Sequence, residues 1–222
     1  MAVNIAIDGP AGAGKSSTAK LVAKKLGYIY VDTGALYRTV GLYFIRKGID
    51  TKDAEKVIAT LPDVKVELKF VDGAQHVFLN GEDVSETIRT PEASMGASNV
   101  SAIPKVREFL FDLQRKIAAE NDCIMDGRDI GTVVLPNADV KIFLTTSVEE
   151  RANRRYKEML EKGEEADYND ILEDIKKRDY QDSHREIAPL KQADDAIYVD
   201  NGGYNLEDGA EDLLRIIKEH LK

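Results

Sequence analysis

The chain has 222 residues, 43% hydrophobic and 32% charged, which fits one domain of ordinary size or one domain with a sizeable insertion. No apolar run approaches the roughly 18 residues of a membrane-spanning helix, and the first residues lack the pattern of a secretory signal. The single cysteine excludes an internal disulfide framework. We therefore expect a cytoplasmic protein without a membrane partner. The formal charge of −9 arises entirely in residues 156–222, where 19 acidic residues outnumber 10 basic ones, and it argues against binding to a nucleic-acid polymer.

Short apolar segments alternate with helical segments along most of the chain. Strands are predicted at residues 3–8, 28–31, 123–126, 140–144 and 197–199. Helices are predicted at residues 15–26 (closed by Gly27), through Leu36, Val40 and Phe44, from Ser147 onward, at 167–179 and at 206–221. Ser147 and Glu150 stand at capping-box spacing. The alternation predicts an α/β fold with a parallel sheet covered by helices on both faces.

Residues 64–88 depart from this alternation of strands and helices. From Val64 to Phe70 apolar and charged residues alternate, which is typical of a half-exposed strand. Asp72-Gly73 and Asn80-Gly81 are both favourable hairpin turns. We therefore expect a small antiparallel β insert between about residues 60 and 100.

A phosphate-binding loop lies between the first predicted strand and the first predicted helix. The residues expected to contact ATP are Gly9, Pro10, Ala11, Gly12, Ala13, Gly14, Lys15, Ser16 and Ser17. Glycines let the backbone wrap closely around phosphates, and the helix N-terminus adds the positive end of its dipole. Lys15 would neutralise the outer phosphates, and the Ser16 hydroxyl is a ligand for Mg²⁺.

The loop alone leaves the reaction open, because GTPases, ATPases and small-molecule kinases all use it. A guanine-specific GTPase normally carries Asn-Lys-x-Asp after a later strand, and the comparable stretch here, Asn137-Ala138-Asp139-Val140, does not match. A kinase of a small acceptor needs a second anion site and a mobile cover that excludes water. Paired arginines are the residues to look for.

Two further motifs follow predicted strands. They read Asp-Thr-Gly-Ala-Leu-Tyr-Arg at residues 32–38 and Asp-Gly-Arg-Asp-Ile-Gly-Thr at residues 126–132. With these motifs the chain resembles the bacterial cytidylate (CMP/dCMP) kinases of the nucleoside monophosphate kinase group. The resemblance continues through residues 98–107, 140–155 and 177–189, and so covers nearly the whole chain.

The resemblance implies a P-loop NTPase core with a five-stranded parallel sheet flanked by helices. The core would comprise residues 1–60, 100–150 and 180–222. A monophosphate-binding β insert would occupy about residues 61–99, and a helical lid about residues 151–179. The cofactor implied is Mg²⁺, with ATP as phosphoryl donor.

The phosphate and the sugar of CMP have implied partners in this family. Arg38 and Arg128 would grip the phosphate, a task for which a bidentate guanidinium suits better than an ammonium. A surface ion pair is the alternative for each. Ser98, Arg178 and Asp182 would hold the sugar hydroxyls; the alternatives are a small helix-packing residue for Ser98 and a helix salt bridge between Arg178 and Asp182.

The base of CMP has four implied partners. Thr33 and Asp129 would accept from the exocyclic amine of cytosine, and Arg107 and Arg185 would donate to the ring carbonyl and ring nitrogen. This pattern would discriminate against uracil, whose carbonyl would oppose an acceptor. The alternatives are a helix N-cap for Thr33 and a turn residue for Asp129.

The lid of the family carries arginines. Arg151, Arg154 and Arg155 lie at i, i+3 and i+4 and share one helix face, where they repel one another unless an anion accepts them. They resemble the arginines that close over the transferring phosphoryl group and are assigned catalytic roles with Lys15 and Arg128. Residues 156–170 would be the mobile lid, with an ordinary solvated helix pair as the alternative.

The metal site has two candidate acids. Asp126 ends a strand where P-loop proteins place the acid that holds magnesium waters, and Asp8, just before the P-loop, is its rival. His76, His184 and His220 share no metal-ligand spacing and are read as solvated or capping residues. Cys123 is read as a small apolar filler in a buried strand.

The predicted reaction is ATP + CMP (or dCMP) → ADP + CDP (or dCDP), with Mg²⁺. The acceptor phosphate is largely ionised at neutral pH, so no general base is required. Two alternatives stay open: a kinase of another acceptor such as UMP, and a nucleotide-gated switch read by a partner protein. We expect a monomer whose partners are the small-molecule substrates.

Overall fold

The computed structural model describes residues 2–71 and 73–221, which fall into two compact units. The P-loop unit comprises residues 3–28 and 123–221. The hairpin unit comprises residue 2 and residues 29–122, apart from residue 72. Among the helices of these described stretches, none is both long enough and apolar enough to cross a membrane.

The larger sheet is parallel and has five strands in the order β2-β6-β1-β7-β8. The strands are β1 (Asn4–Asp8), β2 (Ile29–Asp32), β6 (Cys123–Gly127), β7 (Val140–Thr145) and β8 (Ile197–Asp200). Ile5 pairs with Ile124 on one side and Val140 on the other, and all three are buried. Central strands covered on both faces need such continuous apolar runs, so the predicted α/β fold with a five-stranded parallel sheet is confirmed.

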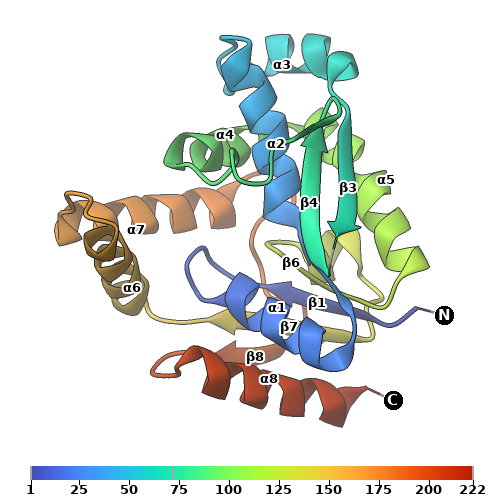
Figure 1. Ribbon diagram of the computed structural model, residues 1–222, viewed down its shortest axis with the longest axis vertical. Coiled ribbons are helices and arrows are strands. Elements are labelled where there is room, and N and C mark those ends of the chain that lie inside the picture. The colour runs from blue at the N-terminus through green and yellow to red at the C-terminus, as the bar shows by residue number, and fades with distance from the viewer. Residues whose placement is uncertain (1, 72, 222) are drawn as a thin grey trace. The chain divides into compact units, whose positions relative to one another are not determined.

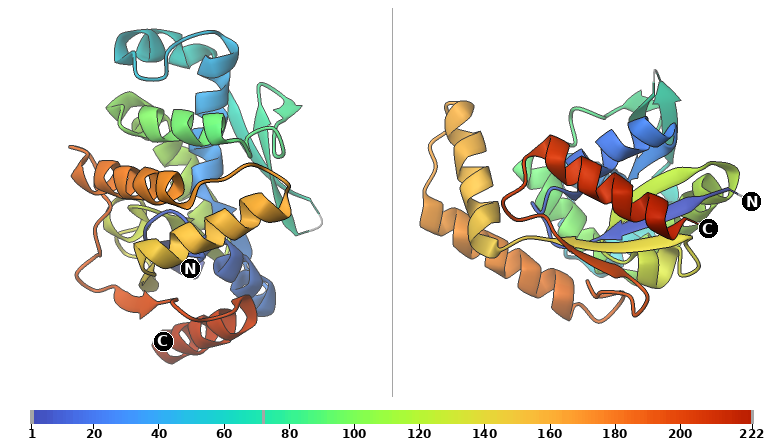
Figure 2. Two further views of the ribbon diagram at one scale, coloured as in Figure 1. Left: turned by 90° about the vertical axis from the view of Figure 1, so that its left-hand side faces the viewer. Right: turned by 90° about the horizontal axis from the view of Figure 1, so that it is seen from below.

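The P-loop unit has two pairs of helices. α1 (Lys15–Leu26) and α8 (Leu206–His220) pack against each other beside the sheet (Figure 2). α6 (Val148–Glu161) and α7 (Tyr168–His184) form a second pair at the carboxyl edge of the sheet, where the P-loop also lies (Figure 1). The predicted end of α7 at residue 179 was wrong, because the helix continues to His184.

The hairpin unit contains the predicted antiparallel sheet. Its strands are β3 (Val66–Val71), β4 (Ala74–Leu79) and β5 (Glu82–Asp83), in the order β3-β4-β5. The Asn80-Gly81 turn is confirmed, since both residues have positive φ, 50° and 90°. In the other predicted turn, Asp72 lies outside the described residues.

The helices of the hairpin unit are α2 (Thr33–Arg46), α3 (Ala54–Thr60), α4 (Pro91–Ser101) and α5 (Pro104–Glu120), with a 3₁₀ turn at Leu61–Asp63. α2 and α4 cross at two glycines. A Cβ on Gly41 would lie 2.8 Å from the backbone of Gly96, so only glycine permits this approach. The close crossing sets the position of the following turn of α4, which carries Ser98.

Candidate active site

The P-loop connects the end of β1 to the start of α1. Gly9 has a φ of 148°, and a Cβ there would lie 1.9 Å from the carbonyl oxygen of Leu144, so no other residue fits. At the start of α1, the N-cap is Gly14, which has no side chain to bond the free N–H groups, and the first turn carries no acidic residue. These N–H groups and the positive end of the helix dipole suit a phosphate.

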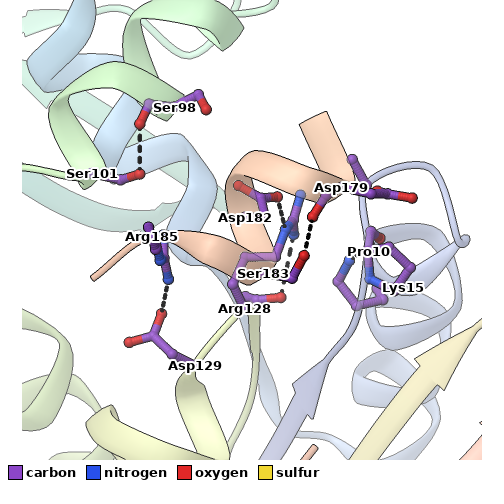
Figure 3. Close-up of polar contacts among 12 residues, drawn as sticks. Pro10, Lys15, Ser98, Ser101, Arg128, Asp129, Asp179, Asp182, Ser183 and Arg185 are labelled. Atoms are coloured by element: carbon purple, nitrogen blue, oxygen red, sulfur yellow. Dashed lines mark hydrogen bonds and ion pairs between the residues drawn. The ribbon is translucent and has the colours of Figure 1, made fainter. Parts of the chain in front are cut away.

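Lys15 is buried at the base of this loop. Its ammonium donates to the carbonyl oxygen of Pro10 at 2.7 Å (Figure 3). Burial and, second, the positive charge of Arg128 lower the pKa of Lys15 to about 7. A bound phosphate would restore the charged form, because it supplies the negative charge that burial makes necessary.

The next residue, Ser16, adjoins one of the two candidate metal acids. The Ser16 hydroxyl donates to Asp126 Oδ2 at 2.8 Å. Hydroxyl and carboxylate oxygens are ligands that Mg²⁺ prefers, so this pair fits the ion. The described residues form no cluster of three or more His, Cys, Asp or Glu that could hold a metal, so Mg²⁺ bound here would also depend on the nucleotide phosphates.

Asp8, the other candidate metal acid, already accepts two hydrogen bonds from the protein backbone. Its carboxylate accepts from the backbone N–H groups of Ile130 and Gly131 at 2.8 and 2.7 Å. Burial raises the pKa of Asp8 to about 6, although these two hydrogen bonds oppose the rise. The geometry therefore favours Asp126 over Asp8 at the metal site.

Two arginine–carboxylate pairs lie in the P-loop unit (Figure 3). Arg128 Nε donates to Asp182 Oδ2 at 2.8 Å, and a guanidinium nitrogen of Arg185 donates to Asp129 Oδ1 at 3.2 Å. Asp182 and Asp129 are buried, and the Arg128 side chain is only 21% exposed, so the alternative of a surface ion pair for Arg128 was wrong. In each pair one residue comes from the 126–132 motif. Its partner is Asp182 in α7 for Arg128, and Arg185 directly after α7 for Asp129.

Asp182 is ionised in this arrangement. Burial alone would raise the pKa of Asp182, but the charge of Arg128 and its hydrogen bond hold that pKa below the usual value. Arg178 and Arg185 act in the same direction through their charges. Asp182 is thus more than the partner of Arg178 in a helix salt bridge, because its hydrogen bond and ion pair are with Arg128.

The three arginines predicted for the lid divide between two environments. Arg151 is 3% exposed and makes a bidentate pair with Asp179 of α7, at 2.9 and 2.5 Å, while donating to the carbonyl oxygen of Ala11 at 3.1 Å. Arg154 donates to the carbonyl oxygen of Asn201 at 3.0 Å. Arg155 points along its own helix toward Glu158, at 3.5 Å, and its side chain is 43% exposed. The structure brings the first two to the P-loop region and leaves the third at the surface.

In the hairpin unit, the start of α2 carries two of the predicted CMP residues. Asp32 caps the helix by accepting from the N–H of Ala35 at 3.0 Å, so the N-cap alternative for Thr33 was wrong. The other carboxylate oxygen of Asp32 pairs with Arg38 at 2.7 Å. The side-chain amide of Gln75, on β4, holds Asp32 from the other direction, accepting from its N–H at 2.8 Å and donating to its carbonyl oxygen at 3.2 Å.

Two more predicted CMP residues lie in the same unit. Arg107 of α5 is buried with its guanidinium 5.8 Å from the ring centroid of Tyr37. Ser98 of α4 is half-buried, and its carbonyl oxygen accepts from the Ser101 hydroxyl at 2.9 Å (Figure 3). The contact with the Tyr37 ring orders the Arg107 guanidinium before any substrate is bound.

Comparison with known proteins agrees with the motifs. The cytidylate kinase family model matches residues 5–219. The chain belongs to the cytidylate kinase family. A cytidylate kinase of Caldicellulosiruptor bescii is 51% identical over 220 residues, 99% of this chain and 97% of that protein. One of Bacillus cytotoxicus is 46% identical over 99% of this chain and 98% of that protein.

Solved structures with low identity share the fold of this cytidylate kinase family member. An uncharacterised protein from Eubacterium ventriosum aligns with a TM-score of 0.54 at 14% identity, covering 99% of both chains. A gluconokinase from Sinorhizobium meliloti aligns with a TM-score of 0.51 at 14% identity, covering 99% of this chain and 93% of its own. The chain therefore shares its fold with these two proteins.

The resemblance to cytidylate kinases did not single out Asp179, Asn201 or Gln75. Asn201 is buried after β8, and its side-chain amide donates to the carbonyl oxygen of Ala13 in the P-loop at 3.0 Å. The three polar residues hold Arg151, the P-loop and Asp32, respectively. The only available signal was the position of Asn201 at the end of a strand and before two glycines.

Proposed function

We propose that the chain transfers the γ-phosphoryl group of ATP to CMP or dCMP and releases ADP with CDP or dCDP. One observation carries the proposal beyond family membership: a second cation, Arg128, lies close enough to the buried P-loop lysine that its charge, after burial, is the next cause of the lowered Lys15 pKa. A second cation beside the P-loop is what a phosphorylated acceptor requires, since donor and acceptor phosphates must meet there.

The acceptor is proposed to be held by the residues that the family resemblance assigns to it. The hairpin unit would contribute Arg38 to the phosphate, Thr33 and Arg107 to the base, and Ser98 to the sugar. The P-loop unit would contribute Arg128 to the phosphate, Asp129 and Arg185 to the base, and Arg178 and Asp182 to the sugar. The Arg185–Asp129 pair supports the base assignment, because it presents a fixed donor and a fixed acceptor side by side, the pattern that cytosine matches and uracil does not.

The chain's own residues act by positioning and by charge. The acceptor phosphate is already an oxyanion near neutral pH, so no side chain has to remove a proton. Lys15 becomes fully charged as the donor phosphates bind and neutralises the charge that shifts toward the leaving oxygen. Ser16 and, through water, Asp126 are the residues that would hold Mg²⁺ with the nucleotide, and the ion would supply further positive charge for the phosphates. Arg151, Arg154 and Arg155 would stabilise the transferring group, a role in which arginine contributes roughly 10³–10⁵ in rate.

A lid is part of the proposal. The α6–α7 pair, about residues 151–179, would close over the phosphates and exclude water, so that ATP is not hydrolysed without acceptor. The insert at about residues 61–99 would complete the monophosphate site. We propose that the protein acts in the cytoplasm and as a monomer. Sedimentation of the purified protein tests whether it is a monomer.

A coupled assay of ADP formation tests the proposal. The purified protein is given ATP and Mg²⁺ with CMP, dCMP, UMP or AMP, or with no acceptor. We expect ADP formation that depends on CMP or dCMP and is much weaker with UMP and AMP. Equal rates with CMP and AMP would refute the cytosine assignment, and ADP formation without an acceptor would point instead to an ATPase or a nucleotide-gated switch.

A further inference from the structure

Asp8 is a buried carboxylate that the proposed chemistry does not use. It ends β1, just before the P-loop, and is 4% exposed. Burying an ionised carboxylate is costly unless it is paired or accepts hydrogen bonds. Its two strong contacts are backbone N–H groups 122 and 123 positions away, at Ile130 and Gly131. Asp8 therefore joins the strand before the P-loop to the loop that carries Arg128 and Asp129.

The N–H groups that Asp8 accepts belong to the start of a short π-helical turn, Ile130–Val134. The N-cap of this turn is Asp129, a residue type that usually bonds the first N–H groups with its own side chain. Here the Asp129 side chain makes no capping bond and instead accepts from Arg185 at 3.2 Å. Asp8 provides the capping carboxylate in its place, from a neighbouring strand.

The charges around Asp8 support this assignment. Lys15 favours its ionised form and Asp129 opposes it, each less strongly than the two backbone hydrogen bonds. The stem of Lys141 packs beside Gly131, but its ammonium is bonded to both oxygens of Asp195 at 2.9 and 2.8 Å. Hydrogen bonds from the turn, more than a cation, thus stabilise the Asp8 carboxylate.

We propose that Asp8 is a positioning residue that caps the Ile130–Val134 turn, so that the Asp129 carboxylate is available for the cytosine amine and Arg128 is aimed at the CMP phosphate. The inference rests on the proposed function, because it assigns Asp8 a purpose in CMP recognition. It predicts that loss of the Asp8 charge damages binding of the acceptor and spares binding of the donor.

The test compares Asp8→Asn with Asp139→Asn. Asp139 is an exposed carboxylate of the same unit that also accepts one backbone N–H, from Asn4 at 2.8 Å, and it serves as the matched control. The amide introduced by Asp8→Asn keeps the size of the side chain but has one accepting oxygen and opposes one N–H with its own donor. We expect Asp8→Asn to raise KM for CMP by about tenfold and to reduce CMP-over-UMP preference, while KM for ATP stays within about twofold.

The outcomes separate the two claims. If Asp8→Asn leaves KM for CMP within about twofold of wild type, or raises both KM values equally, the positioning role is refuted. If Asp139→Asn has the same effect as Asp8→Asn, the effect is not specific to the turn and the role is refuted as well. Wild-type protein without CMP-dependent turnover would refute the proposed function instead.

A measurement on wild-type protein covers the case in which Asp8→Asn does not fold. The amide proton shifts of Ile130 and Gly131 are followed by NMR from about pH 4.5 to 7.5. We expect both amides to titrate with one shared midpoint and to exchange slowly with solvent. Amides that exchange as freely as exposed loop amides, or that do not titrate together, would refute the capping role even if the protein proved to be a CMP kinase.

Discussion

The buried Asp8 carboxylate makes the stability of the protein depend on pH. Its pKa rises from 3.8 to about 6 on folding, because burial disfavours the ionised form. Between these two values the folded chain holds a proton at Asp8 that the unfolded chain has lost. Stability from Asp8 is therefore fully present below about pH 4 and is lost as the pH rises through about 6.

The size of the effect follows from the difference between the two pKa values. One pKa unit corresponds to about 1.4 kcal/mol, so the whole window is worth about 3 kcal/mol of unfolding free energy. About 2 kcal/mol of this lies between pH 4.5 and pH 7.5. Asp8→Asn removes the titration. The hydrogen bond that this substitution also disturbs contributes equally at both pH values and cancels when the pH-dependent changes are compared.

The assay is urea unfolding of wild type and Asp8→Asn, followed by circular dichroism at both pH values. Wild type should lose about 2 kcal/mol more stability than Asp8→Asn as the pH rises from about 4.5 to 7.5. Lys15 and Asp129 are charged neighbours of Asp8 that both proteins retain. The Asp8 charge raises the Lys15 pKa, so its loss in Asp8→Asn lowers that pKa further and enlarges the difference between the two proteins. Parallel losses in the two proteins, equal within about 0.5 kcal/mol, would refute the reasoning that burial raises the Asp8 pKa.

Three further substitutions test the active site. Lys15→Ala should lower kcat by roughly 10³ or more while CMP binding by calorimetry stays nearly unchanged; a near-normal rate would contradict the P-loop assignment. Arg185→Ala should raise KM for CMP by about tenfold or more and reduce the CMP/UMP preference; a selective loss of ATP affinity would place Arg185 on the donor side. Asp179→Asn leaves the buried Arg151 without its bidentate carboxylate and should lower the free energy of unfolding in urea by about 2 kcal/mol. The control Glu173→Gln breaks only an exposed pair and should lower it by less than about 0.5 kcal/mol. Equal losses would show that the Arg151 pair is dispensable.

The apolar pattern of the chain predicted most of the sheet and several helices. Strand runs such as residues 140–144 are buried on both faces, and a helix such as α1 ends at a glycine with positive φ, so local residues carry the signal. The end of α7 could not be predicted in this way, because Asp182 is its only buried residue. Partly buried apolar residues end at Ile175, so the last turns of the helix, which carry the arginine–carboxylate contacts, have no hydrophobic period to read.

The capping box predicted for α6 was half confirmed. The Ser147 hydroxyl accepts from the N–H of Glu150 at 3.1 Å. The Glu150 carboxylate does not complete the box: it bonds the Thr146 hydroxyl and accepts from the N–H of Gly203 at 3.1 Å. A contact 53 residues away replaced the local one, and spacing along a helix contains no information about such a competitor.

The motifs predict candidate residues for the chemistry, but they do not predict what those residues contact in the free protein. Arg151 donates to Asp179, 28 positions away, and the Ala13 carbonyl accepts from Asn201, 188 positions away. Asn201 lies outside the stretches of resemblance, and Asp179 lies within residues 177–189 but was given no role there. Their roles depend on tertiary structure that brings α7 and the end of β8 to the P-loop, which no local pattern encodes.

The acidic partners change what the net charge of −9 means. Besides the exposed Arg155–Glu158 pair, four arginines with proposed roles are paired with carboxylates and are at least partly buried: Arg38 with Asp32, Arg128 with Asp182, Arg151 with Asp179 and Arg185 with Asp129. A paired guanidinium is already ordered, so a phosphate that binds it does not bear the full entropic cost of fixing a long side chain. The same carboxylates weaken the positive potential seen from a distance, so a polyanion is not attracted. Under the proposed assignments, a small nucleotide would be favoured when its phosphate, sugar and base meet these pre-positioned groups together, and selectivity for a compact acceptor would follow from the pairing.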